Sequence, residues 1–491
     1  MPSESLAAQQ GELFRYEAVE KRILALIDSG ELGPGDKIPS LRGMGAKLGL
    51  SVSTVNQAYM ELERLGVIEA RPKSGFFVRA ARKRPPAPEP PRRRECAPRA
   101  VTRSGLILQV LNEFAGYDHL PLGAARTSSD LLPVKALSRI MTRVMAERGW
   151  QATSYGDVVG DQGLRRQIAL RMADLGIEAS PERMIVTAGA MEALFVALRS
   201  VTRPGDNVII ASPSYYCFLQ LLENMGLRAL ELDSRPDRGI DPDELERVAA
   251  RYNVAACILA PNFNNPDGAL IPDANKEKIV GILAKSGTPL IEDDVYGDVY
   301  FGKRRPLTCK SFDRKGLVLY CSSFSKVLCP GYRVGWMLPG AFFDKAFEMK
   351  ATTSVSSAGP SQMTVAEYLG MGGFDRHLRG LRAAMARQAR IMESRVLRYF
   401  PEGVGVTRPE GGAVLWVRLP GGVDASRFYY AAREAGIAVA PGNIFSTCDK
   451  YGDCVRLSHG SPWNDALEDG MRVLGEIAAR LAEEGPAARA V

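Results

Sequence analysis

One segment of this 491-residue chain cannot form part of a folded core, and it divides the sequence into two. Residues 81–104 contain six prolines, eight basic residues and two acidic ones. Their net charge of +6 accounts for most of the +7 of the whole chain. Prolines hold the backbone extended and like charges repel, so we expect a semi-rigid linker between two separately folded parts. We place this linker at residues 81–115.

The composition is that of a globular protein. Nearly half of the residues are apolar and 24% are charged. No apolar run approaches the length of a membrane span, and the N-terminus lacks a secretory pattern, so we expect a cytoplasmic protein without a membrane segment. The three histidines and eight scattered cysteines, none in a CxxC pair, argue against a zinc site. We therefore expect no metal.

Before the linker, residues 12–80 carry the pattern of three short helices and a hairpin. Val19 and Ile23 recur at helical spacing, and Ser40 and Ser51 stand where helix N-caps are expected. Two short apolar runs then flank a Pro-Lys-Ser-Gly turn. This order predicts a winged helix-turn-helix domain, which offers its third helix to the major groove of DNA.

Three motifs of this part, GELGPGDKIPSLR, LSVSTVNQAY and LERLGVIEARPKSGFFV, resemble the GntR-type DNA-binding domain. Residues 37–79 are also net basic, with seven basic and three acidic residues, as a DNA-facing surface requires. A small helical domain that contacts another protein is the alternative. The resemblance implies DNA contacts from the second helix, the start of the third helix and the wing: Arg42, Ser51, Ser53, Thr54, Arg71, Lys73 and Gly75.

Two glycines, Gly43 and Gly45, lie inside the expected second helix. Glycine in a helix interior costs about 1 kcal/mol relative to alanine. Close packing of the second helix against the third would explain both glycines.

After the linker, residues 116–485 alternate between apolar, strand-like runs and helical stretches. The runs include MIVTAGA, NVIIASPS, AACILAP, TPLIEDDVY and GLVLYCSSFS. Such alternation predicts an α/β domain with a mostly parallel sheet. Polar residues close several of the runs, and ligands of open α/β sheets bind beyond the carboxyl ends of the strands.

Lys326 lies in the segment SSFSKVLCPGYR, directly after an apolar run and among small polar residues. Such a lysine can form a Schiff base with an aldehyde, and pyridoxal 5'-phosphate (PLP) is the commonest aldehyde partner. Ser323 and Arg333 are spaced to bind the phosphate of PLP, and Asp293 can pair with its ring nitrogen. The remaining candidates are the amides of Ala190 and Met191 for the phosphate, Tyr215 for stacking on the ring, and Asn265 and Tyr296 for the ring oxygen.

These motifs, in this chain order, resemble the class I/II aminotransferases of fold-type I over roughly residues 120–480. The resemblance implies a mostly parallel sheet and a smaller C-terminal α/β subdomain. It assigns Arg456, in VRLSHG, to the α-carboxylate of a bound amino compound, a task that suits the two-pronged guanidinium. It assigns Tyr155, in SYGDVVGDQGLR, to the cofactor phosphate of the neighbouring subunit, and so implies a homodimer.

A GntR-type DNA-binding domain joined to an aminotransferase-like domain is the arrangement found in MocR-type transcriptional regulators, which this chain resembles. This resemblance implies a dimer that binds double-stranded DNA at an operator with two half-sites. It also implies that the large domain senses PLP, or an amino acid or amine condensed on it. A working aminotransferase with an accessory DNA-binding domain is the competing hypothesis, because the set of cofactor residues is complete. A third alternative, a purely structural large domain, is disfavoured for the same reason.

The basic linker generates a first prediction. Its charge either keeps a tether extended or contacts DNA phosphates between two half-sites. In the second case, replacing Arg92, Arg93 and Arg94 with glutamine removes up to three phosphate contacts. The log–log salt dependence of operator binding should then flatten by up to about three units, because each contact contributes about 0.9. An unchanged slope in a salt titration on a complete operator supports the tether.

Overall fold

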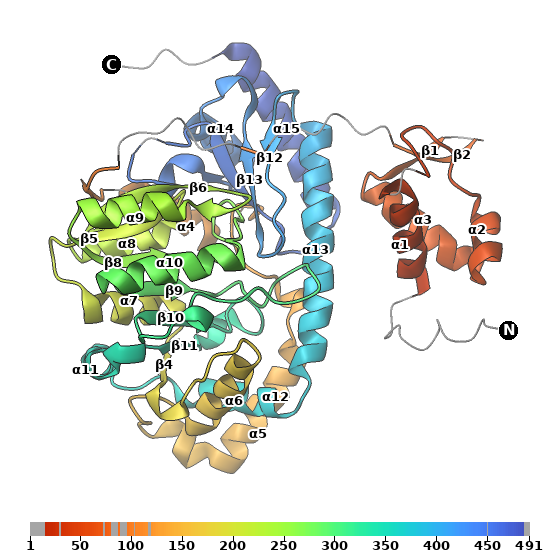
Figure 1. Ribbon diagram of the computed structural model, residues 1–491. Coiled ribbons are helices and arrows are strands. Elements are labelled where there is room, and N and C mark those ends of the chain that lie inside the picture. The colour runs from red at the N-terminus through yellow and green to blue at the C-terminus, as the bar shows by residue number, and fades with distance from the viewer. Residues whose placement is uncertain are drawn as a thin grey trace. The chain divides into compact units, whose positions relative to one another are not determined.

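The computed structural model describes residues 15–28, 31–71, 74–79, 87–88, 96–102, 104–115, 119–448 and 450–485. Its contacts divide the chain into an N-terminal unit, Met1–Arg84 with Arg390–Arg398, and a large unit, Pro85–Ala389 with Tyr399–Val491. Each unit is described by itself (Figure 1).

The N-terminal unit has the predicted winged helix-turn-helix fold. Its elements are α1 (Arg15–Asp28), α2 (Leu41–Leu48), α3 (Val52–Arg64), β1 (Ile68–Arg71) and β2 (Gly75–Val78).

Serine caps and a small apolar core hold the N-terminal unit together. Ser40 Oγ accepts a hydrogen bond from the Gly43 amide, and Ser51 Oγ accepts one from the Thr54 amide, so both serines cap helices as expected. Val19, from α1, has no exposed surface, and several residues of α3 are equally buried. Tyr59 from α3 also packs edge-on against Phe76 of the hairpin, with ring centroids 5.1 Å apart.

The predicted linker, residues 81–115, is too long at its C-terminal end. β3 (Arg99–Ala100) pairs antiparallel with a strand of the large sheet. The helix α4 (Ser104–Ala115) follows it, and Ile107 and Val110 on this helix are buried. The correction has a physical reason: the prolines end at Pro98, directly before β3, and after residue 103 an apolar run with helical spacing begins, which can be buried. Residues 80–86 and 89–95, which hold most of the linker's prolines and charges, lie outside the described residues.

The large unit is built on a sheet with strand order β3-β6-β5-β8-β9-β10-β11-β4, and β7 pairs with β6. The five strands from β6 to β10 along this order run parallel, and β11 is antiparallel to both of its neighbours. This confirms the mostly parallel sheet. The bounds are β4 (Ile185–Thr187), β5 (Asn207–Ser212), β6 (Arg228–Arg235), β7 (Gly239–Ile240), β8 (Val254–Leu259), β9 (Leu290–Asp293), β10 (Val318–Ser323) and β11 (Gly335–Leu338).

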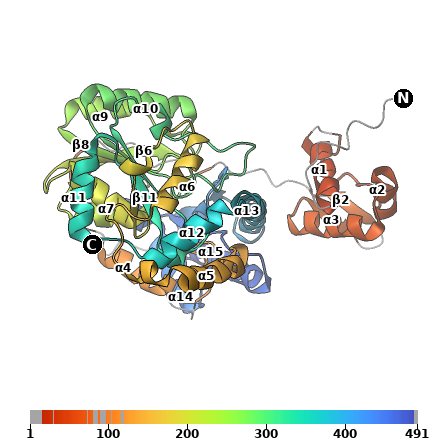
Figure 2. The same cartoon turned by 90° about the horizontal axis from the view of Figure 1, so that it is seen from below.

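Helices cover both faces of this sheet because its strands are apolar on both faces. Within β5, Val208 and Ile210 pack against α7 and α8, whereas Ile209 packs against α9 and α10. Figure 2 shows the sheet between these two layers. The remaining helices that precede the C-terminal subdomain are α5 (Val134–Thr153), α6 (Gln162–Ala173), α7 (Ala190–Val201), α8 (Tyr216–Asn224), α9 (Pro242–Arg251), α10 (Asp273–Ser286), α11 (Phe343–Thr353), α12 (Gly359–Gly370) and α13 (Phe374–Tyr399).

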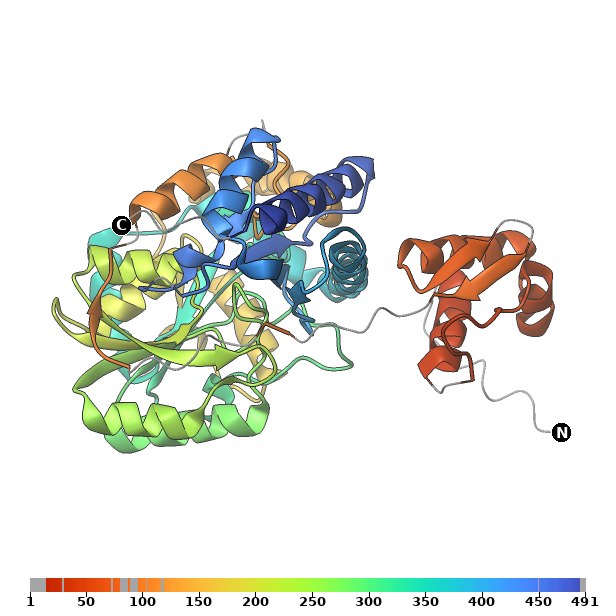
Figure 3. The same ribbon diagram turned by 90° about the horizontal axis from the view of Figure 1, so that it is seen from above.

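The expected C-terminal subdomain has its own four-stranded antiparallel sheet, in the order β12-β13-β15-β14. Figure 3 shows its elements in blue, with helices packed along the small sheet. None of the helices in the described part of the chain is long and apolar enough to cross a membrane. The bounds are β12 (Gly405–Val406), β13 (Val414–Arg418), β14 (Ala440–Pro441), β15 (Cys454–Ser458), α14 (Ala425–Glu434) and α15 (Asp465–Glu484).

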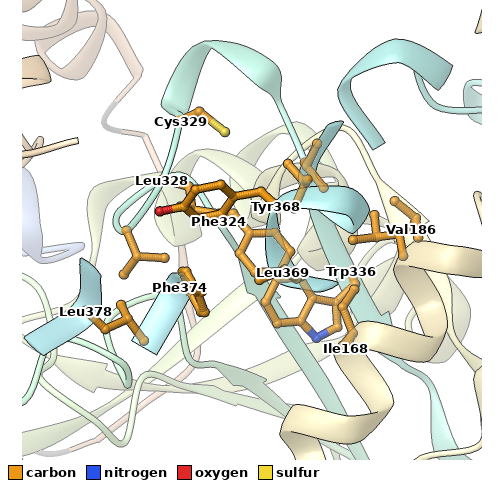
Figure 4. Packing of buried hydrophobic residues seen from close by; sticks show 14 of the residues in the cluster. Ile168, Val186, Phe324, Leu328, Cys329, Trp336, Tyr368, Leu369, Phe374 and Leu378 are labelled. Carbon is orange, nitrogen blue, oxygen red and sulfur yellow. The ribbon is translucent and has the colours of Figure 1, made fainter. Parts of the chain in front are cut away.

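An aromatic cluster anchors the segment that follows β10. Phe324 lies against Trp336, with ring centroids 4.6 Å apart, and against Phe374 at 6.2 Å. Tyr368 of α12 also packs against Phe374, with ring centroids 6.3 Å apart (Figure 4). Rings in such contacts are held in fixed positions. The polar residues next to Phe324 in the chain therefore project from a rigid base.

The two glycines of α2 generate a second prediction. A Cβ at Gly45 would lie 2.8 Å from the backbone oxygen of Leu50 and 3.8 Å from Val55 of α3, whereas one at Gly43 would meet only the Ser40 hydroxyl, at 3.2 Å. Close packing therefore explains Gly45 but not Gly43. Gly45→Ala should therefore lower the free energy of unfolding of the isolated domain by about 1–3 kcal/mol. Gly43→Ala, its matched control, should be neutral or raise it by up to about 1 kcal/mol. Urea unfolding followed by circular dichroism checks both, and equal losses would contradict the packing argument.

Candidate cofactor site at the carboxyl edge of the parallel sheet

Lys326 and Tyr296, both predicted to hold the cofactor, lie together. Lys326 stands three residues beyond the end of β10 and is half-buried. Its Nζ donates a hydrogen bond to the Ala125 carbonyl at 2.7 Å and lies 5.3 Å from the centroid of the Tyr296 ring. The Tyr296 hydroxyl donates to the same carbonyl at 3.2 Å. The amine that would form the Schiff base thus has a defined place beside an aromatic ring.

Asp293 is brought to the same edge by the sheet itself. It ends β9, and β9 runs parallel to β10 with Asp293 opposite Cys321. Burial raises the pKa of Asp293 to about 7, with a further contribution from the charge of Asp294. The Val295 amide, which donates to Asp293 Oδ1 at 3.2 Å, and the ammonium of Lys326 oppose this rise. A buried carboxylate with a raised pKa is suited to pair with a cationic ring nitrogen.

A polar network behind Asp293 was not predicted from the sequence. Asp294 Oδ2 accepts hydrogen bonds from the Tyr320 hydroxyl at 2.8 Å and from Arg305 Nη2 at 2.5 Å. Its Oδ1 accepts one from Asn262 Nδ2 at 2.8 Å. These bonds fix the backbone that carries Asp293. The acidic triplet in IEDDVY was the available signal, but a sequence does not reveal which of its carboxylates pairs with an arginine.

Arg333 reaches the start of α7, as its predicted role in phosphate binding requires. Its Nη2 donates to the Ala188 carbonyl at 3.2 Å, in the turn before α7, and its Nη1 donates to Ser325 Oγ at 3.3 Å. Gly189, the N-cap of α7, has a φ of +83°, and a Cβ there would collide with the Arg333 guanidinium. The α7 N-terminus, which carries the amides of Ala190 and Met191, therefore faces a guanidinium at close range.

Ser323 and Ser325 stand beside this arginine. Ser323 is buried at the end of β10, and its Oγ accepts a hydrogen bond from the Ser325 amide at 3.3 Å. Sequence reasoning singled out Ser323 and missed Ser325, although the repeated Ser-x-Ser before Lys326 was a signal for both. A helix N-terminus, a guanidinium and two hydroxyls form a set that fits a phosphate.

Arg456 and Asn265 meet directly. Arg456, on β15 of the C-terminal subdomain, has no exposed surface, and its Nη1 donates to Asn265 Oδ1 at 2.8 Å. Its Nη2 donates to the Gly123 carbonyl. The guanidinium also lies 5.5 Å from the centroid of the Tyr216 ring. Tyr215, the predicted stacking residue, packs against that ring at 4.8 Å, and burial raises its own pKa well above the ordinary value.

Residues 123–127 form a strap that joins these groups, and sequence reasoning did not identify it. The Gly123 carbonyl accepts from Arg456, and the Ala125 carbonyl accepts from Lys326. Thr127 Oγ1 donates to the backbone carbonyl of Lys326 at 2.8 Å. The sequence carries no signal for this strap, because two of its three contacts are made by backbone carbonyls, which every residue type supplies.

Tyr155 is 90% exposed and follows α5. A tyrosine that serves the site of a second subunit has to be exposed in its own chain, so this position agrees with its predicted role. The role itself stays a prediction.

The predicted DNA contacts lie on the surface of the N-terminal unit. Arg42, Ser51 and Ser53 are exposed, and Ser51 Oγ lies 2.8 Å from both Ser53 Oγ and Thr54 Oγ1. Arg71 is exposed on β1, where its Nε donates to Glu69 at 2.8 Å, and Gly75 begins β2 with a φ of +102°. Lys73 lies outside the described residues. Their contact with DNA stays a prediction.

The two parts of the chain match two families. Residues 15–78 match the bacterial regulatory proteins of the gntR family, and residues 121–466 match aminotransferase class I and II. The HTH-type transcriptional regulator YjiR of Escherichia coli is 34% identical over 96% of this chain and 100% of its own length. The chain belongs to the MocR-type regulators. The HTH-type transcriptional regulator TauR of Rhodobacter capsulatus is similarly related, with 27% identity over 90% of this chain and 92% of its own.

Solved structures show that this MocR-type regulator contains the fold-type I aminotransferase fold. LysN, the α-aminoadipate aminotransferase of Thermus thermophilus, is 28% identical and aligns with a TM-score of 0.72. The alignment covers 76% of this chain and 95% of LysN, whose structure contains N-(5'-phosphopyridoxyl)-L-leucine. Class I and II aminotransferases are PLP-dependent enzymes, and the groups around Lys326 fit that cofactor: an amine, a buried carboxylate and an anion-binding helix start.

The burial of Asp293 generates a third prediction. Its pKa is higher in the folded chain, about 7 against 3.8, so the folded state loses stability as the pH rises between these values. Asp293→Asn keeps an acceptor for the Val295 amide and removes the charge. Cofactor-free variant should therefore be more stable than wild type at pH 8, by at most about 4 kcal/mol, and similar to it near pH 4. Urea unfolding of both proteins at pH 4 and pH 8 measures the difference in their free energies of unfolding. The same difference at both pH values would contradict the prediction.

Proposed function

We propose that this chain binds PLP through Lys326 and regulates transcription by sensing an amino compound that condenses with the cofactor. The observation that carries the proposal is the meeting of Lys326, Asp293 and Arg333 at one edge of the sheet. It occurs in a chain whose N-terminal domain matches the bacterial regulatory proteins of the gntR family. PLP supplies an aldehyde and an electron-withdrawing ring. The residues bind and orient it, and the regulator acts in the cytoplasm.

Each group has one task in this proposal. Lys326 Nζ, which donates a hydrogen bond to the Ala125 carbonyl, would be the amine that holds the cofactor through its aldehyde. Asp293 would hold the ring nitrogen, because a positive charge beside it would offset the cost of burying its carboxylate. Arg333 and the α7 N-terminus hold the phosphate, with help from Ser325, and Ser323 supports Ser325. Asn265 and Tyr296 accept or donate at the ring oxygen, and Tyr215 covers the ring.

Arg456 gives the site a preference for effectors with a carboxylate. Its guanidinium is fully buried and bonds to a neutral amide and a neutral carbonyl, Asn265 and Gly123. A carboxylate makes shorter and stronger bonds to guanidinium than either of these groups does. An amino acid can therefore displace one of these contacts, and because Gly123 begins the strap, binding is transmitted to the strap that also holds Lys326.

The proposal also includes a homodimer that binds an operator made of two half-sites. Tyr155 reaches the phosphate of the partner's cofactor, so each site needs two chains. Two winged helix-turn-helix domains then bind two half-sites, since operator symmetry mirrors the symmetry of the protein. The second candidate, a working aminotransferase, is supported by the complete set of cofactor residues. The regulators that match nearly the whole chain favour the sensing function.

The role of Arg456 generates a fourth prediction. A panel of amino acids is titrated into PLP-loaded protein, and the absorption of the bound cofactor and the affinity for an operator are recorded. Arg456→Gln should weaken the response to the active amino acid about 10- to 100-fold, since a bond to a charged group contributes about 1.5–3 kcal/mol. Wild type and Arg456→Gln should both respond weakly, and to the same extent, to the matching amine that lacks the carboxylate. An equal loss for that amine would place Arg456 outside the carboxylate site.

The same samples distinguish a sensor from an enzyme. If the protein is a sensor, adding the amino acid should change its affinity for the operator, while the keto-acid product accumulates only slowly. Turnover of about 1–1,000 per second would support the aminotransferase instead. Borohydride reduction followed by peptide mapping should find the cofactor on Lys326. Label on a different lysine would overturn the assignment of the site.

A further inference from the structure

A second cleft of the large unit lies between α5, α12 and the start of α13, and it is not part of the cofactor site. Its volume is about 790 Å³, within the range of pockets that bind small molecules. Its base is apolar and includes Leu131, Ile140, Tyr368 and Leu381. Tyr368 belongs to the aromatic cluster of Figure 4, so this base is rigid.

Three arginines line the same cleft: Arg139, Arg143 and Arg376. One carboxylate, Asp130, lines it with them. Arg143 is paired with Glu367 of α12. Arg139 and Arg376 have no carboxylate partner within the described ranges of the chain. The cleft therefore combines an apolar base with guanidinium groups whose charge is not neutralised locally, a combination that suits an organic anion.

Two glycines leave the cleft open. Gly373 and Gly380 line it, and a Cβ at either position would meet no atom within 4 Å. Gly380 lies inside α13, where glycine costs about 1 kcal/mol relative to better helix formers. At this position a larger side chain would occupy the cleft without straining the helix.

The cleft borders the segments on both sides of Lys326. His377 lines it, and the Nε2 of His377 donates to the Val327 carbonyl at 2.6 Å. On the other wall, Asp130 and Leu131 follow the strap, in which Thr127 Oγ1 donates to the Lys326 carbonyl. A ligand in the cleft thus lies beside His377, which contacts Val327, and beside Asp130, which follows by three residues the threonine that contacts Lys326.

We propose that this cleft is a second ligand site, which binds a small organic anion with an apolar body. The anionic group lies between Arg139 and Arg376, where guanidinium groups can form two-pronged bonds to a carboxylate or sulfonate. The apolar body covers Tyr368, Ile140 and Leu381. This site is separate from the Arg456 carboxylate site, and its existence does not depend on the proposed sensing function.

The test uses the full-length, PLP-loaded protein and 4-(4-fluorophenyl)butyrate as the probe, followed by fluorine NMR. The probe carries a carboxylate and an aromatic ring but no amine, so it cannot condense with PLP. Wild type should bind it saturably, with one probe per chain. Gly380→Leu fills the cleft and should weaken binding at least tenfold. Gly281→Leu is the matched control, because Gly281 is an exposed glycine inside α10 with no atom within 4 Å of a built Cβ. It should bind as wild type does.

The charge is tested separately. The uncharged analogue, 4-(4-fluorophenyl)butan-1-ol, should bind at least tenfold more weakly than the acid. The double variant Arg139→Gln, Arg376→Gln should abolish this difference. Equal binding of acid and alcohol to wild type would overturn the anion site, and so would unchanged binding to Gly380→Leu. If Gly380→Leu converts dimers to monomers on size exclusion, the cleft is a surface between two copies and the proposal is overturned.

Discussion

The parallel pairing of β9 with β10 is the constraint on which the cofactor site depends. Parallel strands end at the same edge of a sheet, so Asp293 and the segment that begins at Ser323 emerge side by side although 29 residues separate them in the chain. Arg333 stays at this edge because it lies in the connection between β10 and the antiparallel β11, two residues before β11 begins. There it meets the start of α7, which follows β4, the neighbour of β11. The amine, the carboxylate and the anion-binding groups come together without any sequence motif linking them.

The contact between β11 and the start of α7 is close enough to dictate residue type. A Cβ at Gly335 would lie 2.5 Å from the backbone of Gly189. Gly189 in turn lies against the guanidinium of Arg333. Two glycines facing each other across the strand end let the start of α7 approach β11 and Arg333 closely. The same arrangement leaves little room for substitution, because any side chain here would move either the helix start or the arginine.

Burial at this edge has an energetic cost that the cofactor can offset. The carboxylate of Asp293 and the guanidinium of Arg456 are both nearly inaccessible to water. Asp293 has its pKa raised to about 7, and Arg456 bonds to neutral partners, Asn265 and Gly123. Each therefore gains more from an oppositely charged ligand group than an exposed residue would. A site of this kind couples occupancy to the stability of the surrounding backbone, and through the strap at residues 123–127 to both subdomains.

The sequence by itself determined the two-part organisation, the winged helix-turn-helix fold, the parallel sheet and most of the candidate residues around Lys326. These follow from local signals: a proline-rich basic segment, helix caps, alternating apolar runs, and a lysine among hydroxyls. Only the tertiary structure decided that α4 belongs to the large unit, that Asp294 pairs with Arg305, and that the strap joins Arg456 to Lys326. It also decided that Arg139 and Arg376 share a cleft. The physical reason is that most of these contacts join residues far apart in the chain, and several use backbone carbonyls, which every residue carries and no sequence pattern marks. Asp294 and Arg305 are only 11 residues apart, but the sequence does not show which of three neighbouring carboxylates the arginine pairs with.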